Sequence, residues 1–325
     1  MQDRPSRRSP ELAVSVVVPT RNRADRLRGL LGALERQTLA SNRFELVVVN
    51  DGSKDQTSLV LAEAGKVAPF AIDVVEGRGA GPAAARNAGW RRASGQLVAF
   101  TDDDCEPDPG WLEAGVSAAC SNPVGLVQGR TRPIEREAKK LGLRSRTKWI
   151  DGLGPWYQTC NIFYARELLE LVGGFDETFA RPFGEDVDLA WRALERGAEA
   201  IYNPSAVVRH AVEKLGPLDY VLSGLRDPDE ALIFKRHPEL RREVGRLGVF
   251  KGDSHALLPL AGAALLAAEG RWWLYSLTLP YLAHVSLRIR GAEAHPVEVP
   301  LVLARDTLEL ASAIRGAIRH RVLFV

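Results

Sequence analysis

The sequence predicts an α/β protein with a largely parallel sheet covered by helices, followed by a helical C-terminal region. Between about residues 13 and 210, runs of β-branched and aliphatic residues alternate with segments of helical periodicity. That alternation is typical of parallel sheets whose strands are joined by helices. Beyond about Leu215 the composition changes, and helical segments rich in Leu and Ala dominate.

Four buried strands are expected in the first half of the chain, because each run is short, apolar and rich in β-branched residues. They cover residues 14–19, 45–51, 72–75 and 96–101. A first helix is predicted from the helical spacing of Leu27, Leu30, Leu31 and Leu34. Ser53 and Gln56 form a capping-box pattern that opens a second helix. A third helix is predicted over residues 81–93, with Pro82 in its first turn, and a fourth is predicted to begin at about Pro109.

The second half of the α/β region has a less regular pattern. Residues 131–148 are charged and lack clear periodicity, so they are expected to form a mobile loop or a short helix. Residues 156–165 resemble a strand, and residues 166–175 a short helix that ends at Gly173. Residues 184–197 form a well-marked helical pattern, with acids in its first turn.

Charge and cysteine content narrow the function classes. The net charge of +2 gives no reason to expect a nucleic-acid partner. Cys105, Cys120 and Cys160 show neither the spacing of a metal site nor a disulfide framework, which favours the reducing cytoplasm. Residues 1–11 are basic and rich in Pro and Ser without an apolar segment, so we expect a disordered tail and no signal peptide.

Polar clusters directly follow three of the predicted strands, at residues 20–22, 50–53 and 102–104. Because ligands gather at the carboxyl ends of parallel strands, these clusters should meet along one edge of the sheet. Asp102, Asp103 and Asp104 stand side by side, although adjacent like charges repel. The run is either a solvated turn or the site of a hard divalent cation, Mg²⁺ or Mn²⁺.

Four stretches together resemble the family-2 glycosyltransferases with the GT-A fold: VVVPTRNRADRLRGLLGAL, ELVVVNDGSKDQT, GPAAARNAGWRRASGQLVAFTDDD and GGFDETF…GEDVDLAWRALERG. The resemblance covers about residues 12–212 in the family's order. It implies a catalytic domain over residues 12–214, with a nucleotide-sugar donor half at 12–130 and an acceptor half at 131–214. Residues 215–325 would be the helical C-terminal region. The implied reaction is an inverting, metal-dependent transfer of a sugar from a nucleotide-diphosphate sugar.

The resemblance also assigns donor-binding residues. Pro19, Thr20 and Arg21 match the strand-end segment that lines the nucleotide pocket. Asp51, in the NDGS motif with Gly52, matches the acid that accepts a hydrogen bond from the base. A carboxylate suits the N–H of uracil or thymine, so UDP, or else dTDP, is favoured over ADP, and a guanine donor stays open because guanine also offers N–H groups. An Asx turn capping the next helix is the alternative role.

Arg86 in AARN matches the residue that contacts the donor diphosphate, and an exposed helix arginine is the alternative. Asp102 and Asp104 match the family's DxD motif, with Asp104 as the direct metal ligand and Asp102 nearer the ribose. Asp103, between them, belongs to the donor side. His210 stands where some relatives place a further metal ligand, although a lone histidine is more often structural.

Asp186 in GEDVD matches the general base that takes the proton of the acceptor hydroxyl, and Glu185 would support it. A plain helix cap is the alternative for Asp186. The chain lacks the QxxRW motif of processive members, which indicates transfer of a single sugar to a sugar, lipid-linked or other hydroxyl acceptor. The expected setting is the synthesis of a glycan, a glycolipid or a cell-envelope polysaccharide.

Two other functions compete with this interpretation. A sugar nucleotidyltransferase can share a similar sheet, but it would carry a Gly-rich loop after the first strand, where this chain has PTRNR. A catalytically silent nucleotide-sugar-binding protein would not need both the acidic run and the Glu185–Asp186 pair.

The C-terminal region contains two apolar runs, residues 256–268 and 272–287, interrupted by Pro259 and Pro280. Each is shorter than a usual membrane span. Three interpretations stay open: helical core or homodimer interface, a helix pair on the inner face of the cell membrane, or a true span. Trp272 and Trp273 suit the level of lipid headgroups, but aromatic side chains also pack cores.

Overall fold

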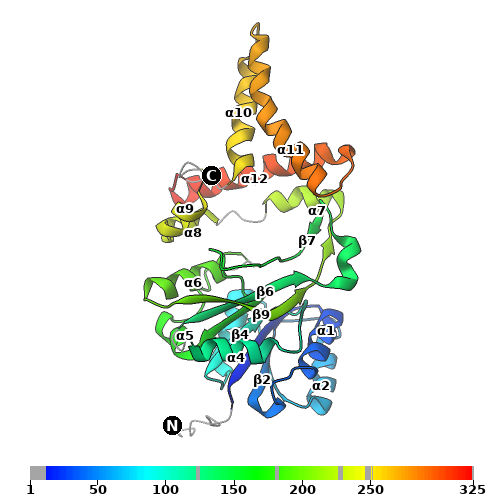
Figure 1. The fold of residues 1–325 in the computed structure, drawn as a ribbon, viewed down its shortest axis with the longest axis vertical. Coiled ribbons are helices and arrows are strands. Elements are labelled where there is room, and N and C mark those ends of the chain that lie inside the picture. Colours follow the sequence, from blue (N-terminus) through cyan, green and yellow to red (C-terminus); the bar gives the residue numbers. More distant parts are fainter. Residues whose placement is uncertain are drawn as a thin grey trace. The chain divides into compact units, whose positions relative to one another are not determined.

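The computed structural model describes residues 12–121, 125–179, 183–225, 230–245, 250 and 252–323. The predicted disordered tail, residues 1–11, lies outside them. The chain divides into two compact units (Figure 1), and each is considered by itself. The first unit comprises Met1–Arg136 and Thr147–Ala211, and the second comprises Glu137–Arg146 and Val212–Val325.

An eight-stranded sheet forms the centre of the first unit, in the order β3-β2-β1-β4-β8-β6-β9-β5. Its first four strands are parallel: β1 (Val14–Thr20), β2 (Phe44–Asn50), β3 (Ala71–Glu76) and β4 (Leu97–Thr101). Every residue of β4 is buried, as expected of a strand covered on both faces. The predicted α/β class is confirmed.

The other half of the sheet is mixed. Strand β8 (Asn161–Ala165) runs antiparallel to both β4 and β6 (Leu126–Pro133). Strand β9 (Ala200–His210) is parallel to β6, and the short β5 (Cys105–Pro107) is antiparallel to β9. The expectation of a loop or short helix over residues 131–148 is only partly correct, because Thr131–Pro133 extend β6 before the 3₁₀ helix η2 (Glu135–Lys140).

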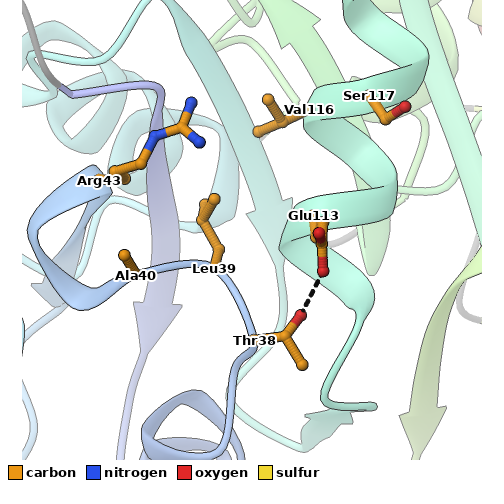
Figure 2. A pocket seen from close by; sticks show the side chains of 7 residues that line it. All are labelled: Thr38, Leu39, Ala40, Arg43, Glu113, Val116 and Ser117. Carbon is orange, nitrogen blue, oxygen red and sulfur yellow. Dashed lines mark hydrogen bonds between the residues drawn. The ribbon is translucent and has the colours of Figure 1, made fainter.

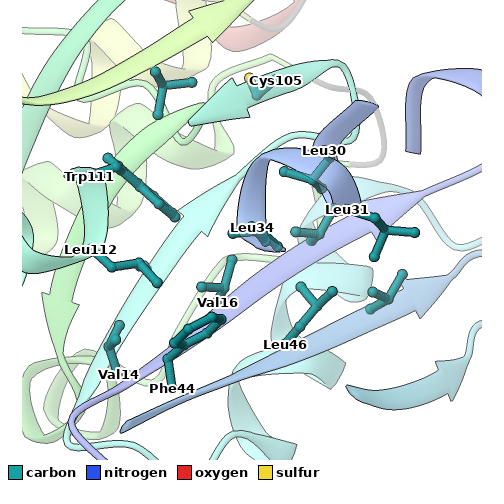
Figure 3. Close-up of a cluster of buried hydrophobic side chains, with 14 of the residues drawn as sticks. Val14, Val16, Leu30, Leu31, Leu34, Phe44, Leu46, Cys105, Trp111 and Leu112 are labelled. Atoms are coloured by element: carbon teal, nitrogen blue, oxygen red, sulfur yellow. The ribbon is translucent and has the colours of Figure 1, made fainter. Parts of the chain in front are cut away.

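Helices cover both faces of this sheet. One face packs against α1 (Ala24–Glu35), α2 (Thr57–Val67) and α4 (Trp111–Ser121), as the buried side chains in Figure 3 illustrate. The other face packs against α3 (Pro82–Arg92), α5 (Arg166–Val172) and α6 (Glu185–Glu195). A short 3₁₀ helix, η1 (Ser41–Arg43), precedes β2.

The capping box predicted for the second helix is wrong. Helix α2 begins at Thr57, and Asp55 Oδ1 accepts hydrogen bonds from the backbone N–H and the hydroxyl of Thr57. Asp55 Oδ2 accepts a further bond from the Ala24 N–H at the start of α1. Ser53 instead accepts a hydrogen bond from the Asn22 N–H, so it ties two strand-end loops together.

The second unit is helical, apart from a two-stranded pairing of β7 (Ser145–Arg146) with β10 (Glu213–Lys214). Its other elements are α7 (Pro217–Leu222), η3 (Ser223–Leu225), α8 (Glu230–Arg236), α9 (Pro238–Val244), α10 (Asp253–Ala267), η4 (Trp272–Thr278), α11 (Leu279–Gly291), η5 (Pro296–Glu298) and α12 (Val299–His320). The predicted helical C-terminal region is therefore confirmed. A small core forms where α10 and α11 meet α12, around Tyr281, Val285 and Val302.

Helices α10 and α11 lie side by side as a hairpin whose closed end points away from α12 (Figure 1). Within the part of the chain that the structure describes, none of the helices is both long enough and apolar enough to cross a bilayer. The hairpin nevertheless exposes many large apolar side chains around its closed end, among them Leu260, Leu265, Leu266, Trp272, Trp273, Tyr275, Leu279 and Leu282.

Candidate active site

The polar loops after β1, β2 and β4 meet at one edge of the sheet, as the sequence predicts. The buried Thr20 hydroxyl donates a hydrogen bond to Asp103 Oδ2 over 2.8 Å. The Thr20 carbonyl accepts a hydrogen bond from the Asp51 N–H over 2.9 Å. Thr20, at the end of β1, therefore connects the two predicted halves of the donor site.

Each of the three consecutive aspartates has its own partner, which explains how like charges can stand side by side. Asp102 Oδ1 accepts a hydrogen bond of 2.9 Å from Arg86 Nη2. Arg23 Nη1 lies 2.7 Å from Asp104 Oδ2 and 3.4 Å from Asp103 Oδ1. Sequence reasoning missed Arg23, whose partners lie some 80 positions further along the chain.

Burial and the neighbouring charges separate the pKa values of these acids. Burial raises the pKa of Asp103 to about 7, against the opposing charge of Arg23. Burial also disfavours the charge of Asp102, but Arg86, His210 and Lys148 together outweigh it, so the pKa of Asp102 lies below its usual value. Asp102 is therefore kept ionised by its cationic neighbours.

Strand pairing brings His210 to the acidic run. Cys105 of β5 stands opposite His210 of β9, and the Ala211 N–H donates to the Asp104 carbonyl over 2.9 Å. His210 Nδ1 lies 2.8 Å from the Ala211 carbonyl oxygen, which can only accept, so Nδ1 carries the proton. Nε2 is the ring nitrogen that faces the acidic run, and it lies 3.6 Å from Asp104 Oδ1.

Asp102, Asp104, Cys105 and His210 each offer one potential ligand atom, all within 4.8 Å of one another. The two carboxylates and the imidazole fit a hard divalent cation, and the carbonyl bond at Nδ1 is the usual orienting contact of a metal-binding histidine. Cys105 fits poorly. Its buried thiol donates weakly to the Cys160 carbonyl, and burial raises its pKa well above the usual range.

Arg86 joins the acidic run to helix α6. Its guanidinium is buried, and it donates to Asp102 Oδ1 over 2.9 Å and to Glu185 Oε1 over 2.8 Å. The alternative of an exposed helix arginine is therefore wrong. Two buried atoms of this arrangement, Arg86 Nε and Glu185 Oε2, have no hydrogen-bond partner among the described residues.

Helix α6 carries the acid pair in its first turn, after Gly184 at φ +93°. Asp186 is not the N-cap residue, and its Oδ1 accepts a hydrogen bond of 2.9 Å from the Val187 N–H. Burial raises the pKa of Asp186 against the opposing charges of Lys148 and Arg86. Burial and the charge of Asp186 raise the pKa of Glu185 to about 7. Lys148 also acts on Asp102, and no sequence pattern pointed to it.

The predicted base-binding residues surround the loop at residues 77–81. Asp51 Oδ1 accepts hydrogen bonds from the N–H groups of Gly79 and Ala80, and Oδ2 accepts one from Gly81. Asp51 thus holds this loop and does not cap α2. A Cβ at Gly77 would lie 2.6 Å from Asp51 Oδ1, so that contact requires glycine.

Two of the remaining predicted residues lie beside this loop. The exposed Arg21 guanidinium would lie 3.6 Å from a Cβ at Gly79, and Gly52, at φ +75°, approaches the Gly79 backbone. Pro19 is half-buried in β1. No described hydrogen bond joins the Asp51 carboxylate to the acidic run.

A hollow in the surface lies away from the predicted site residues. Its volume is about 290 Å³, and Figure 2 shows Thr38 donating to Glu113 at its edge. The hollow is lined by Thr38, Leu39, Ala40 and Arg43, which precede β2, and by residues of α4, so it lies at the amino-terminal end of β2. It holds neither the acidic run nor the pair on α6, and size alone does not identify the active site here.

Comparison with known proteins agrees with this geometry. Residues 15–181 match the family model described as Glycosyl transferase family 2. The chain belongs to glycosyltransferase family 2. The pre-mycofactocin glycosyltransferase of Mycobacterium tuberculosis is 31% identical over 327 residues, which cover 93% of this chain and 64% of that relative. The chain therefore spans less than two thirds of that relative's length. The glycosyltransferase AglE of Haloferax volcanii is 29% identical over 63% of this chain and 69% of its own.

Two solved structures relate the fold to bound ligands. The mannosyltransferase PcManGT from Pyrobaculum calidifontis, in complex with GDP-Man and Mn²⁺, superposes on this chain with a TM-score of 0.65 and 25% identity. That match covers 95% of this chain and 86% of the neighbour. Staphylococcus aureus TarS 1–349 in complex with UDP has a TM-score of 0.54 and 18% identity, and supports the GT-A fold alone.

Proposed function

We propose that this glycosyltransferase moves one sugar from a nucleotide-diphosphate sugar to an acceptor hydroxyl, with inversion at the anomeric carbon and with a divalent cation. One observation carries the proposal. The acidic run after β4 and the acid pair of α6 lie within reach of a single buried guanidinium, that of Arg86. Donor phosphate groups and an acceptor-side base would thereby share one site.

The cation would be held by Asp104, Asp102 and His210. When bound, Mg²⁺ or Mn²⁺ neutralises charge on a departing diphosphate. Asp102 is kept ionised by Arg86 together with its other cationic neighbours, and the bond from His210 Nδ1 to the Ala211 carbonyl leaves Nε2 as the ring atom that would bind the cation. The Mn²⁺ bound to the 25%-identical mannosyltransferase supports the choice of metal.

Arg86 would contact the donor diphosphate through its Nε–H. Two of its nitrogens are engaged with Asp102 and Glu185, but Nε is buried without a partner among the described residues. A phosphate oxygen would satisfy this donor, and leaving it unsatisfied costs about 1–3 kcal/mol. Thr20 would help by fixing Asp103 away from that position.

Asp51 would recognise the base of the donor nucleotide, with a preference for UDP. An ionised carboxylate offers about four acceptor positions. Three backbone N–H groups of residues 79–81 already use most of them, which leaves about one for the N–H of uracil. Gly52 and Arg21 would shape the rim of the same pocket.

Asp186 would act as the general base, because burial raises its pKa toward the range in which a carboxylate accepts a proton efficiently. Glu185 would support it by fixing Arg86. The acceptor is a hydroxyl of a sugar or of a lipid-linked molecule, in the synthesis of a glycan, glycolipid or cell-envelope polysaccharide.

The hairpin of α10 and α11 would bring the enzyme to a membrane surface. On α10, Leu266 lies roughly opposite the buried Ala261 and Ala264, and Leu260 and Leu265 lie on either side of them. A single protein partner covers one side of a helix pair, whereas a lipid interface surrounds its end. Exposed Trp272 and Trp273 suit that interface. A homodimer is the competing occupant.

The decisive experiment incubates the full chain with Mn²⁺ and a panel of UDP, dTDP, GDP and ADP sugars, and separates the nucleotides produced. We expect release of UDP without pyrophosphate, and a product of inverted anomeric configuration by NMR. Pyrophosphate as the product would identify a nucleotidyltransferase. If a nucleotide sugar binds but is neither transferred to any acceptor class nor hydrolysed, the chain is a silent nucleotide-sugar-binding protein.

A further inference from the structure

A small pocket lies against the segment that follows Lys148, and none of the roles above uses it. Its volume is about 140 Å³, well below the roughly 300–1,000 Å³ of pockets for larger ligands, so it has room for one small ring. Its walls include three aromatic side chains, Trp149, Trp156 and Tyr157, and three polar ones, Gln128, Asp151 and Gln158.

Trp149 is the most unusual member of this wall, because its indole is 60% exposed and yet held in place. Its Nε1–H donates to Asp151 Oδ2 over 2.7 Å. The Arg132 guanidinium lies 4.5 Å from the ring centroid and also forms a two-pronged ion pair with Asp151. Arg132 covers one face of the indole, so the other face is available for a flat ligand at little entropic cost.

The polar groups around the indole fit hydroxyl groups. Gln128 Nε2 donates to the Asn161 carbonyl over 2.6 Å, which fixes the amide beside the pocket. Hydrogen bonds from Arg132 and then Trp149 hold the pKa of Asp151 below its usual value, so this carboxylate is a permanent acceptor. An acyl chain would desolvate these polar groups without offering them any further hydrogen bond. A sugar ring has an apolar C–H face for the indole and hydroxyl groups for the rim.

The pocket adjoins the proposed catalytic base. The residue before Trp149 is Lys148, whose charge acts on both Asp102 and Asp186. Ile150 exchanges two backbone hydrogen bonds of 3.0 Å with Thr131, which anchors the wall to β6. On the other side, Trp191 Nε1, from helix α6, donates to the Pro155 carbonyl over 3.0 Å. The wall is thus braced against the helix that carries Asp186.

We propose that this pocket binds one sugar ring of the acceptor, stacked on the open face of Trp149. This inference rests on the proposed function, since it names the acceptor class of the same site. The acceptor is then a glycoside or a glycan end, and its ring is selected by an aromatic surface that Arg132 and Asp151 hold in place.

The test measures sugar binding without any donor, on the full chain. The probes are the methyl glycosides of glucose, galactose, mannose and N-acetylglucosamine at millimolar concentration, observed by saturation-transfer NMR. We expect at least one of them to bind, and Trp149→Ala to weaken it about tenfold. Trp149→Phe should keep most of the affinity, because it retains an aromatic face. Trp273→Ala removes a similarly exposed indole elsewhere and should change nothing.

Two controls keep the outcome clear. Because Trp149 is exposed, the unfolding temperature of Trp149→Ala should match that of the wild type. If Trp149→Ala is less stable, the comparison of glycoside affinity is made with Trp149→Phe instead. Binding of n-octyl phosphate at Trp149 in place of every glycoside would overturn the inference, as would equal glycoside binding by wild type and Trp149→Ala, or no glycoside binding at all.

Nucleotide diphosphates with Mn²⁺ are titrated into the same samples. If they bind and the glycosides do not, the inference fails while the proposed donor chemistry stands. If glycosides bind through Trp149 and no nucleotide does, the proposed function fails while the sugar site stands.

Discussion

At the scale of single residues, the site depends on which acid meets which cation. Asp102, Asp103 and Asp104 are neighbours in sequence, but they face Arg86, Thr20 with Arg23, and Arg23 with His210, respectively. One run of identical residues therefore supplies three different chemical environments.

Asp104→Asn should abolish metal-dependent nucleotide binding and leave the fold intact. The amide removes the negative charge that a divalent cation requires, and the contact with Arg23 is partly exposed and contributes little to stability. Isothermal titration of UDP with and without Mn²⁺ measures the effect. Asp73→Asn, which alters an exposed pair with Arg92, is the matched control and should bind normally. Unchanged Mn²⁺-dependent affinity in Asp104→Asn would refute the assignment.

Asp186→Asn should keep donor affinity near that of the wild type while turnover falls about 10²–10⁴-fold. The amide preserves the size of the side chain but cannot take the acceptor proton. Steady-state kinetics and NMR of the product's anomeric carbon check the two parts of the assignment. Near-normal turnover, or a product that retains the donor's configuration, would contradict it.

Glu185 should make stability depend on pH in the protein free of metal and donor. Its pKa is raised from 4.5 to about 7 by burial and by Asp186, with Arg86 opposing. Between these values the folded protein binds the proton more tightly than the unfolded chain, so stability falls as pH rises through this window and levels off above it. One group contributes a slope of at most about 1.4 kcal/mol per pH unit.

Urea unfolding of the wild type and of Glu185→Gln, from pH 4.5 to 8, tests this prediction. The difference in the free energy of unfolding between wild type and Glu185→Gln should change with pH up to about 7 and then stay constant, because glutamine does not titrate. Parallel curves over the whole range would show that Glu185 titrates normally.

Residue types at strand ends could be predicted, but their partners could not. The Asp102–Asp104 run and the Glu185–Asp186 pair stand out in the sequence because identical or paired acids follow an apolar run or open a helix. Arg23 and Lys148 lie in irregular segments without periodicity, so only the fold brings them to the acids.

At the scale of elements, periodicity predicted the first half of the sheet well, because β1, β2 and β4 are buried on both faces and mostly apolar. Strand β9 could not be read in the same way. It is interrupted by Asn203, Pro204 and Ser205, residues typical of turns, at the point where its register with β6 shifts between Gly129 and Arg130. Sequence pattern alone therefore does not predict this strand on the acceptor side of the sheet.

The hairpin of α10 and α11 is the element with the most specific expectation. The full chain should co-sediment with vesicles that contain phosphatidylglycerol at low salt, and its tryptophan fluorescence should shift to the blue. Replacing Trp272 and Trp273 by Ser should weaken binding about tenfold or more, because two exposed aromatic side chains no longer insert.

Trp149→Ser, which removes an exposed indole from the other unit, should still bind the vesicles normally. If the full chain ignores the vesicles and instead has the mass of a dimer that the Trp272 and Trp273 replacements dissociate, the hairpin is a homodimer interface.

At the scale of the whole molecule, the two compact units do not follow each other simply along the chain. The second unit takes residues 137–146 from within the stretch that otherwise builds the first. Glu137 Oε2 accepts a hydrogen bond from the Val212 N–H, and Ser145 and Arg146 pair with Lys214 and Glu213. No change in composition marks this segment, so its assignment required the fold.

The pairing of β7 with β10 has a consequence for synthesis on the ribosome. Lys214 leaves the ribosome 69 residues after its partner Ser145, which at typical rates is about 3–14 s later. During that interval β7 has no strand to pair with. The segment carries Lys139, Lys140, Arg144 and Arg146 against one acid, Glu137. These charges obscure any periodicity in the segment. They also favour its hydration and disfavour pairing with a non-native strand before β10 is made.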